Sequence, residues 1–190
     1  NEKVKIGGAV GVWGAGGVGV KIVQGGAMTS AYPIVAIDLY DDKLALSRKM
    51  GATHTFNAKE INVSSEIRSV VGTEGADVVI DNTGNPDVIR TCYDLTSPRG
   101  RTVLVGVPAQ NQDVTLYTLP LHFDKTLTGS HGGESEPEKD IPRYLRLEER
   151  GSLELKSLVT DRYPLSKINN AIEDMQSGRI SGRCMIYMSE

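Results

Sequence analysis

The chain has 190 residues, with 21 lysines and arginines against 24 aspartates and glutamates, a net charge of −3. This balance provides no electrostatic attraction for nucleic acid or an anionic membrane, and no apolar run approaches the roughly 18 residues that span a bilayer. Only two cysteines occur, Cys92 and Cys184, which excludes a disulfide scaffold and a four-cysteine zinc site. Residues 1–5 lack the apolar core of a signal peptide. We therefore expect a soluble, reduced, cytoplasmic protein.

Short apolar runs alternate with longer amphipathic segments over the first 130 residues. Several runs are apolar at successive positions, as in Ile34-Val35-Ala36-Ile37 and Val78-Val79-Ile80, which predicts strands buried on both faces of a parallel sheet. The predicted strands are residues 9–13, 34–38, 54–56, 76–81, 101–107 and 126–130. Helices are predicted between them, at residues 18–28, 42–50, 61–71 and 85–95.

Local signals mark the ends of these helices. Gly25-Gly26 weakens the end of the first helix by about 1 kcal/mol per glycine, and Gly51 can supply the left-handed residue after the second. Asn85-Pro86-Asp87 is typical of a helix start, with asparagine as the cap, proline at the first position and an acid in the first turn. Strand and helix thus alternate, which predicts an α/β fold with a doubly wound six-stranded parallel sheet, the Rossmann architecture.

The character of the sequence changes after about Gly133. A polar stretch at residues 134–139 is followed by two predicted helices, residues 141–150 and 165–176, and by short strands at 158–159 and 184–188. We therefore predict a sheet domain over residues 1–133 and a C-terminal α/β extension over residues 134–190. The extension either continues the sheet domain or belongs to another domain whose remainder lies elsewhere.

The segment Gly14-Ala15-Gly16-Gly17-Val18-Gly19 fits the pattern G-x-G-x-x-G between a predicted strand and a predicted helix. Gly14 permits the tight turn, Gly16 lets a pyrophosphate approach the backbone, and Gly19 lets the helix pack close to the sheet. The N–H groups of Gly17 and Val18 lie at the helix N-terminus, which attracts phosphate. This motif predicts a dinucleotide-binding domain, and the absence of Gly-Lys-Ser/Thr excludes a Walker-type phosphate loop.

An acidic residue ends the second predicted strand. Asp38 lies 19 residues after Gly19, close to the spacing of about 20 at which a carboxylate accepts the ribose hydroxyls. A 2′-phosphate there would meet a like charge, so NAD is favoured over NADP. Lys43 could donate to the same ribose or be a solvated helix lysine; Tyr40 could flank the adenine or be an exposed loop residue.

The fourth and fifth strands end beside the point where the strand order is expected to reverse. Ligands of doubly wound sheets bind at the carboxyl ends of strands beside that point. Backbone groups of Thr83, Gly84, Val105, Gly106 and Val107 could therefore reach the nicotinamide ribose and carboxamide, although these residues could also be ordinary turns.

No catalytic or metal-binding constellation is evident. The three histidines, His54, His122 and His131, are scattered and show no ligand spacing, and no Ser-His, Cys-His or H-E-x-x-H arrangement occurs. We therefore assign neither a catalytic residue nor a metal ligand to this chain.

Together these motifs resemble the cofactor-binding half of the zinc-containing alcohol dehydrogenases, the medium-chain dehydrogenase/reductase superfamily. The resemblance rests on residues 14–19, Asp38 with Lys43, residues 51–53, 81–84 and 100–108, and a tail that contains Tyr163-Pro164-Leu165, Ile168-Asn169, Ala171-Ile172, Ser177-Gly178 and Arg183. The family's N-terminal catalytic domain, with its zinc ligands and proton relay, is not in these residues. The chain would thus be an excised domain or part of a truncated relative.

The resemblance also implies roles outside the glycine loop. It implies that Arg183 approaches the pyrophosphate, that residues 134–190 pack partly on the missing catalytic domain, and that an edge strand at Leu127, Thr128, Gly129 and Ser130 joins two copies into a homodimer.

We therefore expect the NAD-binding domain of a zinc-dependent alcohol dehydrogenase. The parent enzyme would transfer a hydride between a small alcohol or aldehyde and NAD, and this fragment alone would be inactive. A zinc-free quinone reductase of the same superfamily is an alternative, although Asp38 argues against it because those relatives mostly use NADPH. A non-catalytic nucleotide-binding module would use the same glycine loop. A methyltransferase also pairs such a loop with an acid, but the third glycine and the tail fit it poorly.

Overall fold

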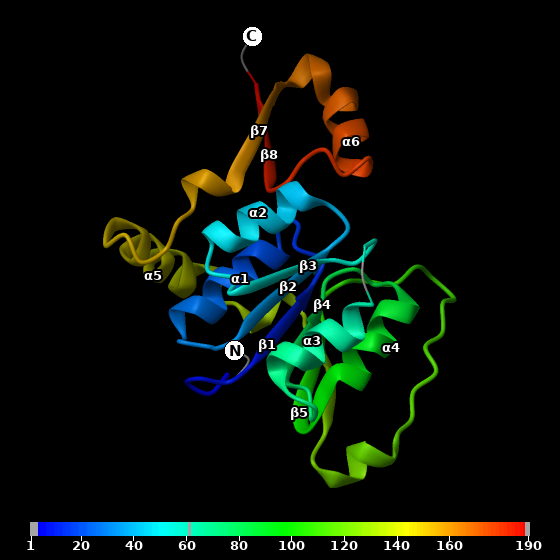
Figure 1. Ribbon diagram of the computed structural model, residues 1–190. Coiled ribbons are helices and arrows are strands. Elements are labelled where there is room, and N and C mark those ends of the chain that lie inside the picture. The colour runs from blue at the N-terminus through cyan, green and yellow to red at the C-terminus, as the bar shows by residue number, and fades with distance from the viewer. Residues whose placement is uncertain (1–3, 61, 189–190) are drawn as a thin grey trace. The chain divides into compact units, whose positions relative to one another are not determined.

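The computed structural model describes residues 4–60 and 62–188 (Figure 1). The chain divides into two compact units, Asn1–Ser135 and Glu136–Glu190, and each is described by itself. Most of the N-terminal segment at residues 1–5, and residue 61 at the start of one predicted helix, lie outside the described residues.

The first unit is an α/β domain. Its strands are β1 (Val10–Trp13), β2 (Ile34–Asp38), β3 (His54–Asn57), β4 (Ala76–Asp81), β5 (Thr96–Leu104) and β6 (Thr126–Gly129). Its helices are α1 (Gly19–Met28), α2 (Asp41–Lys49), α3 (Val63–Val71) and α4 (Pro86–Leu95), with short 3-10 turns η1 (Leu119–Phe123) and η2 (Gly132–Glu134).

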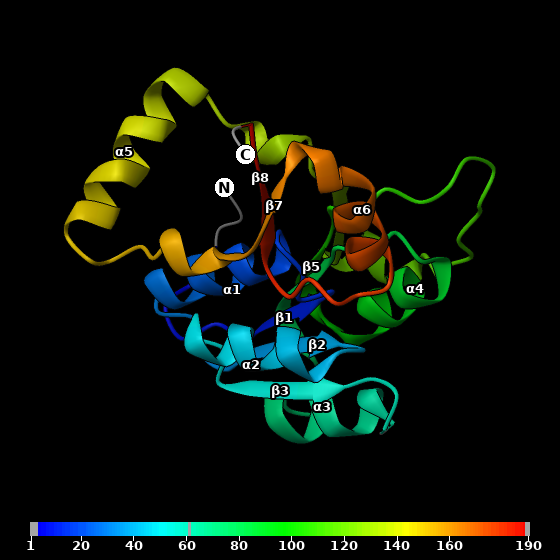
Figure 2. The ribbon, with the colours of Figure 1, turned by 90° about the horizontal axis from the view of Figure 1, so that it is seen from above.

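The six strands form one parallel sheet in the order β3-β2-β1-β4-β5-β6. Helices α1 and α2 cover one face of the sheet, and α3 and α4 cover the other (Figures 1 and 2). This arrangement confirms the predicted doubly wound Rossmann sheet. Its strand order reverses between β1 and β4, so the carboxyl ends of these two strands flank the crevice where ligands of such sheets bind.

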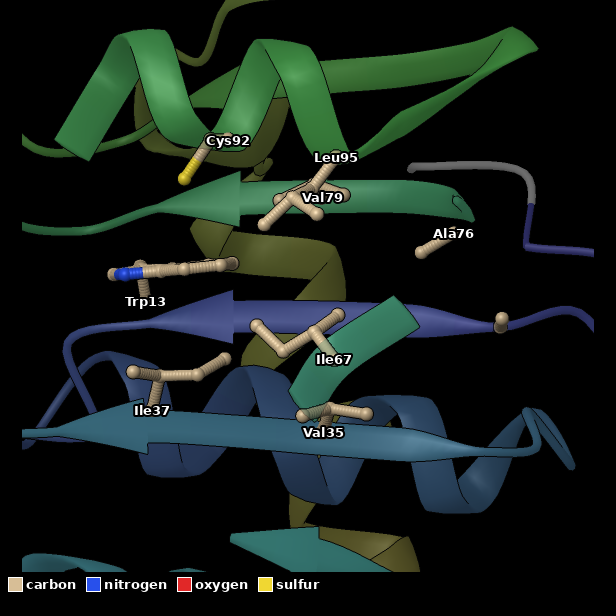
Figure 3. Close-up of a cluster of buried hydrophobic side chains, with 9 residues drawn as sticks. Trp13, Val35, Ile37, Ile67, Ala76, Val79, Cys92 and Leu95 are labelled. Carbon is tan, nitrogen blue, oxygen red and sulfur yellow. The ribbon is translucent and has the colours of Figure 1, made fainter. Parts of the chain in front are cut away.

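Burial on both faces explains the continuous apolar runs of the central strands. On one face, strand side chains meet α3 and α4 in a core cluster that Figure 3 shows in close-up. The cluster consists of Ala9, Trp13, Val35, Ile37, Ala76 and Val79 from the strand side, with Ile67, Cys92 and Leu95 from the helices. Ile34 and Ala36 alternate with Val35 and Ile37 along β2 and are equally buried, because the opposite face is covered too.

The start of α4 follows the sequence prediction. The Asn85 side chain accepts hydrogen bonds from the N–H groups of Asp87 (2.9 Å) and Val88 (3.3 Å), and Pro86 is the first helical residue. Two unpaired donors of the first turn are thereby satisfied.

The fifth strand differs from its prediction at both ends. It begins at Thr96, and its register against β4 shifts between Ala76 and Val78. It ends at Leu104, because the next two N–H groups, of Val105 and Gly106, both donate to the Asp81 carbonyl (2.8 and 2.9 Å). Val105, Gly106 and Val107 therefore belong to the loop that follows the strand.

The second unit contains α5 (Pro137–Glu149), β7 (Val159–Pro164), α6 (Ile168–Gln176) and β8 (Arg183–Tyr187), with 3-10 turns η3 (Lys156–Leu158) and η4 (Leu165–Lys167). Strands β7 and β8 form a parallel pair. The predicted helices and strands are present with shifted limits: α5 begins at Pro137, and β7 continues to Pro164 because all but its second residue pairs with β8.

None of the helices formed by residues 4–60 and 62–188 is long and apolar enough to cross a membrane.

Candidate functional site

The glycine loop lies between the carboxyl ends of β2 and β4. Trp13, the last residue of β1, is opposite Ile37 on one side and Asp81 on the other. The N–H of Gly14 donates to the Ile37 carbonyl, and the N–H of Asn82 donates to the Trp13 carbonyl, both at 2.9 Å. The first glycine of the motif therefore lies at the predicted reversal of strand order.

Two glycines of the motif are required by the packing of the protein itself. Gly14 has φ +84, and a Cβ there would lie 3.2 Å from Thr83 Cγ2. A Cβ at Gly19 would lie 1.9 Å from the Gly14 carbonyl oxygen, which no side chain can accommodate without movement of the loop. These contacts let the first turn of α1 approach the end of β1 closely.

Gly16 is different, because a Cβ built on it would meet no protein atom within 4 Å. Its φ is not in the left-handed region either. Neither conformation nor packing within the described protein accounts for glycine at this position. The space beside the Gly16 Cα is therefore open.

Unpaired backbone donors occur in the same segment. The N–H groups of Gly16, Gly17 and Val18 donate to no acceptor among the described residues, and the Val18 side chain does not cap the helix. The Gly16 carbonyl, by contrast, accepts from Val20 N at 2.9 Å as α1 begins. Free N–H groups at a helix N-terminus carry partial positive charge and attract anions.

The Asp38 carboxylate ties this loop to the end of β2. One oxygen accepts from the Ala15 N–H at 2.7 Å, and the other accepts from the N–H groups of Leu39 (2.8 Å) and Tyr40 (3.2 Å). Two carboxylate oxygens offer about four acceptor positions, so capacity remains for a further donor. Asp38 is only partly buried.

Lys43 lies in the first turn of α2 and contacts an aromatic ring. Its ammonium is 4.6 Å from the centre of the Tyr40 ring, and Lys59 Nζ lies 4.5 Å from the same ring. Tyr40 is therefore half-buried beside two cations instead of a fully exposed loop residue.

The fully buried Asp81 organises the loops after β4 and β5. Its carboxylate accepts from Thr83 N (2.9 Å), Thr83 Oγ1 (2.6 Å) and Gly84 N (3.0 Å), while its carbonyl holds Val105 and Gly106. Burial raises the pKa of the Cys92 thiol, and the nearby charge of Asp81 adds to this effect. Asp81, to which the sequence analysis assigned no role, thus holds four predicted site residues: Thr83, Gly84, Val105 and Gly106.

The two loops contact each other through glycine. A Cβ at Gly84 would lie 2.5 Å from the Val107 carbonyl oxygen, and a Cβ at Gly106 would lie 2.3 Å from Gly84 N. Packing between the loops accounts for glycine at both positions. Val107 is left 88% exposed at the rim.

The structure thus brings together twelve of the predicted residues at one edge of the first unit: Gly14, Gly16, Gly17, Val18, Gly19, Asp38, Lys43, Thr83, Gly84, Val105, Gly106 and Val107. The thirteenth, Arg183, belongs to the second unit, where it is exposed and pairs with Val159 at the start of β8. Its predicted role at the pyrophosphate stays a prediction.

Three residues near the site were not assigned roles from the sequence: Asp81, Asn82 and Lys59. The Asn82 side chain donates to the Gly14 carbonyl at 3.3 Å and so joins the loop after β4 to the glycine loop. A charged residue directly after Val78-Val79-Ile80 was a usable signal for Asp81, because a buried strand end must satisfy a carboxylate there. No feature of the sequence around Lys59 indicated that this residue would lie near the site.

The described residues contain no group of three His, Cys, Asp or Glu side chains arranged to hold a metal ion.

Comparison with known proteins places the chain among dehydrogenases. The family described as "Zinc-binding dehydrogenase" matches residues 17–149. Alcohol dehydrogenase 2 of Oryza sativa subsp. japonica is 32% identical over 192 residues, which covers 99% of this chain and 50% of the relative. Alcohol dehydrogenase class-2 isozyme 2 of Oryctolagus cuniculus is 32% identical over 189 residues, again over 50% of its length. The chain spans about half the length of the curated relatives it matches.

Solved structures of related proteins have the same fold as this chain. An alcohol dehydrogenase zinc-binding domain protein from Burkholderia ambifaria superposes with a TM-score of 0.90 at 31% identity, over 98% of this chain and 50% of that one. Benzyl alcohol dehydrogenase from Acinetobacter calcoaceticus superposes with a TM-score of 0.91 at 28% identity, over 98% and 51%.

Proposed function

Because the chain belongs to the zinc-binding dehydrogenase family, we propose that its first unit binds NAD as the cofactor domain of a zinc-dependent alcohol dehydrogenase. One observation carries the proposal: in a loop that the Asp38 carboxylate holds, the N–H groups of Gly16, Gly17 and Val18 have no acceptor among the described residues, and the space beside the Gly16 Cα is open. The amides are suited to a diphosphate, and Asp38 is suited to the hydroxyls of the adenosine ribose.

The remaining site residues have roles in this proposal along the rest of the cofactor. Thr83, Gly84, Val105, Gly106 and Val107 border the nicotinamide half, with Asp81 as the residue that holds both loops in place. Lys43 contacts the adenosine ribose, and Arg183 of the second unit contacts the pyrophosphate.

The chemistry belongs to a longer enzyme. NAD when bound supplies the hydride acceptor, and the reaction would convert a small alcohol to an aldehyde or ketone with a zinc ion held by a catalytic domain. The chain's own residues bind and orient the cofactor, and residues 134–190 pack against that catalytic domain. A cytoplasmic location and a homodimer through Leu127, Thr128, Gly129 and Ser130 complete the proposal.

The competing functions receive less support. A carboxylate at the end of β2 opposes the 2′-phosphate of NADPH, which a zinc-free quinone reductase would use. The relatives above are named alcohol dehydrogenases, and none of those names describes a nucleotide-sensing module.

Calorimetric titration of the 190-residue chain tests the proposal. NAD is expected to bind more tightly than NADP, and S-adenosylmethionine is expected not to bind. Absence of NAD binding, or tighter binding of S-adenosylmethionine, would overturn the proposed function.

A further inference from the structure

A tyrosine ring with two ammonium groups lies beside Asp38. The Tyr40 ring centre is 4.6 Å from Lys43 Nζ and 4.5 Å from Lys59 Nζ, which are ordinary distances for cation–π contacts. Tyr40 follows Asp38 by two residues, and its N–H donates to the same carboxylate. We refer to Tyr40, Lys43 and Lys59 as the two-lysine cluster.

Asn57 fixes both lysines relative to Asp38. It is opposite Asp38 in the β2–β3 register, and the next N–H, of Ala58, donates to the Asp38 carbonyl at 3.0 Å. Asn57 Nδ2 donates to Asp41 Oδ1 at 2.8 Å, at the start of α2, while its Oδ1 accepts from Lys59 N at 3.0 Å. One side chain thus holds the turn that carries Lys59 and the helical turn that carries Lys43.

Ion pairing within the described protein does not explain the two cations. Lys43 occupies the first turn of α2, where the helix dipole disfavours positive charge. Among the described residues, neither ammonium lies within 4.0 Å of a carboxylate oxygen. Asp38 itself is engaged by three backbone N–H groups, and Asp41 is engaged by Asn57. The ammonium groups therefore remain available to an anion.

We propose that Lys59 is a specificity-determining residue for the cofactor: with Lys43 on the same tyrosine ring, it offers cationic surface to a 2′-phosphate. The preference for NAD over NADP is then set by the balance of Asp38 against the two-lysine cluster, and not by Asp38 alone. This inference rests on the proposed function, because it concerns the adenosine end of the same site.

The Lys59 ammonium should affect NADP and NAD differently, because the two cofactors differ in charge at the 2′ position. A phosphate monoester carries about −1.5 to −2 charges at pH 7, whereas the ribose of NAD carries none at this position. An ammonium near the 2′ position therefore stabilises bound NADP much more than bound NAD. For an exposed lysine we expect a change of about threefold to tenfold in the NADP dissociation constant.

The test compares NAD and NADP binding by calorimetry in wild type, Lys59→Met and Lys59→Arg. Lys59→Met is expected to weaken NADP about threefold to tenfold and to change NAD less than about twofold, and Lys59→Arg to retain NADP binding. Added salt screens charges, so the change in NADP affinity caused by Lys59→Met should become smaller at high salt. A change caused only by altered structure would not depend on salt in this way. Lys49→Met, an exposed lysine in the last turn of α2, is the matched control for net charge.

The same comparison in an Asp38→Gly background tests the effect of Lys59 on NADP binding even if the wild-type protein binds NADP weakly. There Asp38→Gly/Lys59→Met should bind NADP about threefold to tenfold more weakly than Asp38→Gly alone. An unchanged NADP constant in both backgrounds, an equal change for NAD and NADP, or an equal effect of Lys49→Met would overturn the inference alone. A wild-type chain that binds no NAD would overturn the proposed function, and this inference with it.

Discussion

The N–H of Ala15 donates a 2.7 Å hydrogen bond to the Asp38 carboxylate, which joins the glycine loop to the end of β2. The residue proposed to select the cofactor therefore also positions the loop proposed to hold its phosphates. Substitution at Asp38 is expected to affect both properties.

Asp38→Gly should narrow or invert the preference for NAD over NADP, because it removes the charge that repels a 2′-phosphate. It should also lower the free energy of unfolding by about 1–2 kcal/mol through loss of the Ala15 contact. Calorimetry and urea unfolding measure the two effects. Asp42→Asn removes an exposed charge from the first turn of the adjoining helix α2; it should leave the preference for NAD unchanged and lower the free energy of unfolding by less than about 1 kcal/mol. Wild-type protein that binds NADP as tightly as NAD would contradict the role of Asp38.

Gly16→Val should abolish NAD binding and leave the fold intact, because the added side chain meets no protein atom and enters the space assigned to the pyrophosphate. Circular dichroism and calorimetry separate these outcomes. Gly25→Ala, also in open space but on α1, should retain NAD affinity. A Gly16→Val protein with wild-type affinity would remove the argument for a phosphate cradle.

Gly19→Ala should instead destabilise the protein by about 1–3 kcal/mol, because its Cβ would clash with the Gly14 carbonyl oxygen. The measurement is the urea midpoint of unfolding. A midpoint equal to that of Gly25→Ala would show that the loop relaxes without cost.

Leu127→Pro should convert the proposed dimer into a monomer. Strand β6 is the outermost strand on its side of the sheet, and Ser130 N donates to the Leu104 carbonyl of β5. Because alternate residues of a strand point their N–H groups to opposite sides, the Leu127 N–H points to the open edge, and proline removes a donor there without breaking the β5–β6 ladder. The charge next to this edge, on Lys125, is turned inward: its Nζ donates to the Thr96 carbonyl at 2.8 Å, and burial lowers its pKa.

Sedimentation at micromolar concentration measures this change, with Leu127→Ala, which keeps the N–H, as the control. A monomeric wild type or a dimeric Leu127→Pro protein would discard the β6 interface.

Tyr163→Phe should destabilise the second unit in a pH-dependent manner. The Tyr163 hydroxyl donates to Asp174 Oδ2 at 2.5 Å, and this hydrogen bond raises the pKa of Tyr163 to about 12. The hydroxyl loses its proton near pH 10 in the unfolded chain, so its contribution is complete below pH 10 and is lost between pH 10 and about 12. The difference in urea midpoint between wild type and Tyr163→Phe should shrink over that interval. Tyr144→Phe, on exposed α5, is the control; a difference that stays constant to about pH 12 would contradict the assignment.

The 190-residue chain should bind NAD without forming NADH from an alcohol, even with zinc added. Its curated relatives contain about as many residues again that this chain does not match, and we assign the zinc ligands to those residues. Absorbance of NADH during incubation with NAD and ethanol or benzyl alcohol is the assay. Zinc-dependent NADH formation would reveal a catalytic group within the chain.

Local patterns in the sequence were sufficient for the architecture. The apolar run Ile34-Val35-Ala36-Ile37 predicted a doubly buried strand, and Asn85-Pro86-Asp87 predicted the start of α4, because the apolar pattern and the helix cap are each contained in a few consecutive residues. The spacing from Gly19 to Asp38 predicted a glycine loop and a ribose-binding carboxylate that serve one dinucleotide, and the hydrogen bond from Ala15 N to Asp38 shows that the two segments lie side by side.

Only the tertiary structure decided how the site is held together. Asp81 binds two loops that are far apart in the chain, and Gly84 and Gly106 are glycines because those loops touch. The Tyr40 ring contacts both Lys43 and Lys59, although Lys43 lies on α2 and Lys59 lies in the segment after β3. These contacts depend on how neighbouring loops pack against one another in the folded sheet. The pattern of residue types along the chain does not specify that packing.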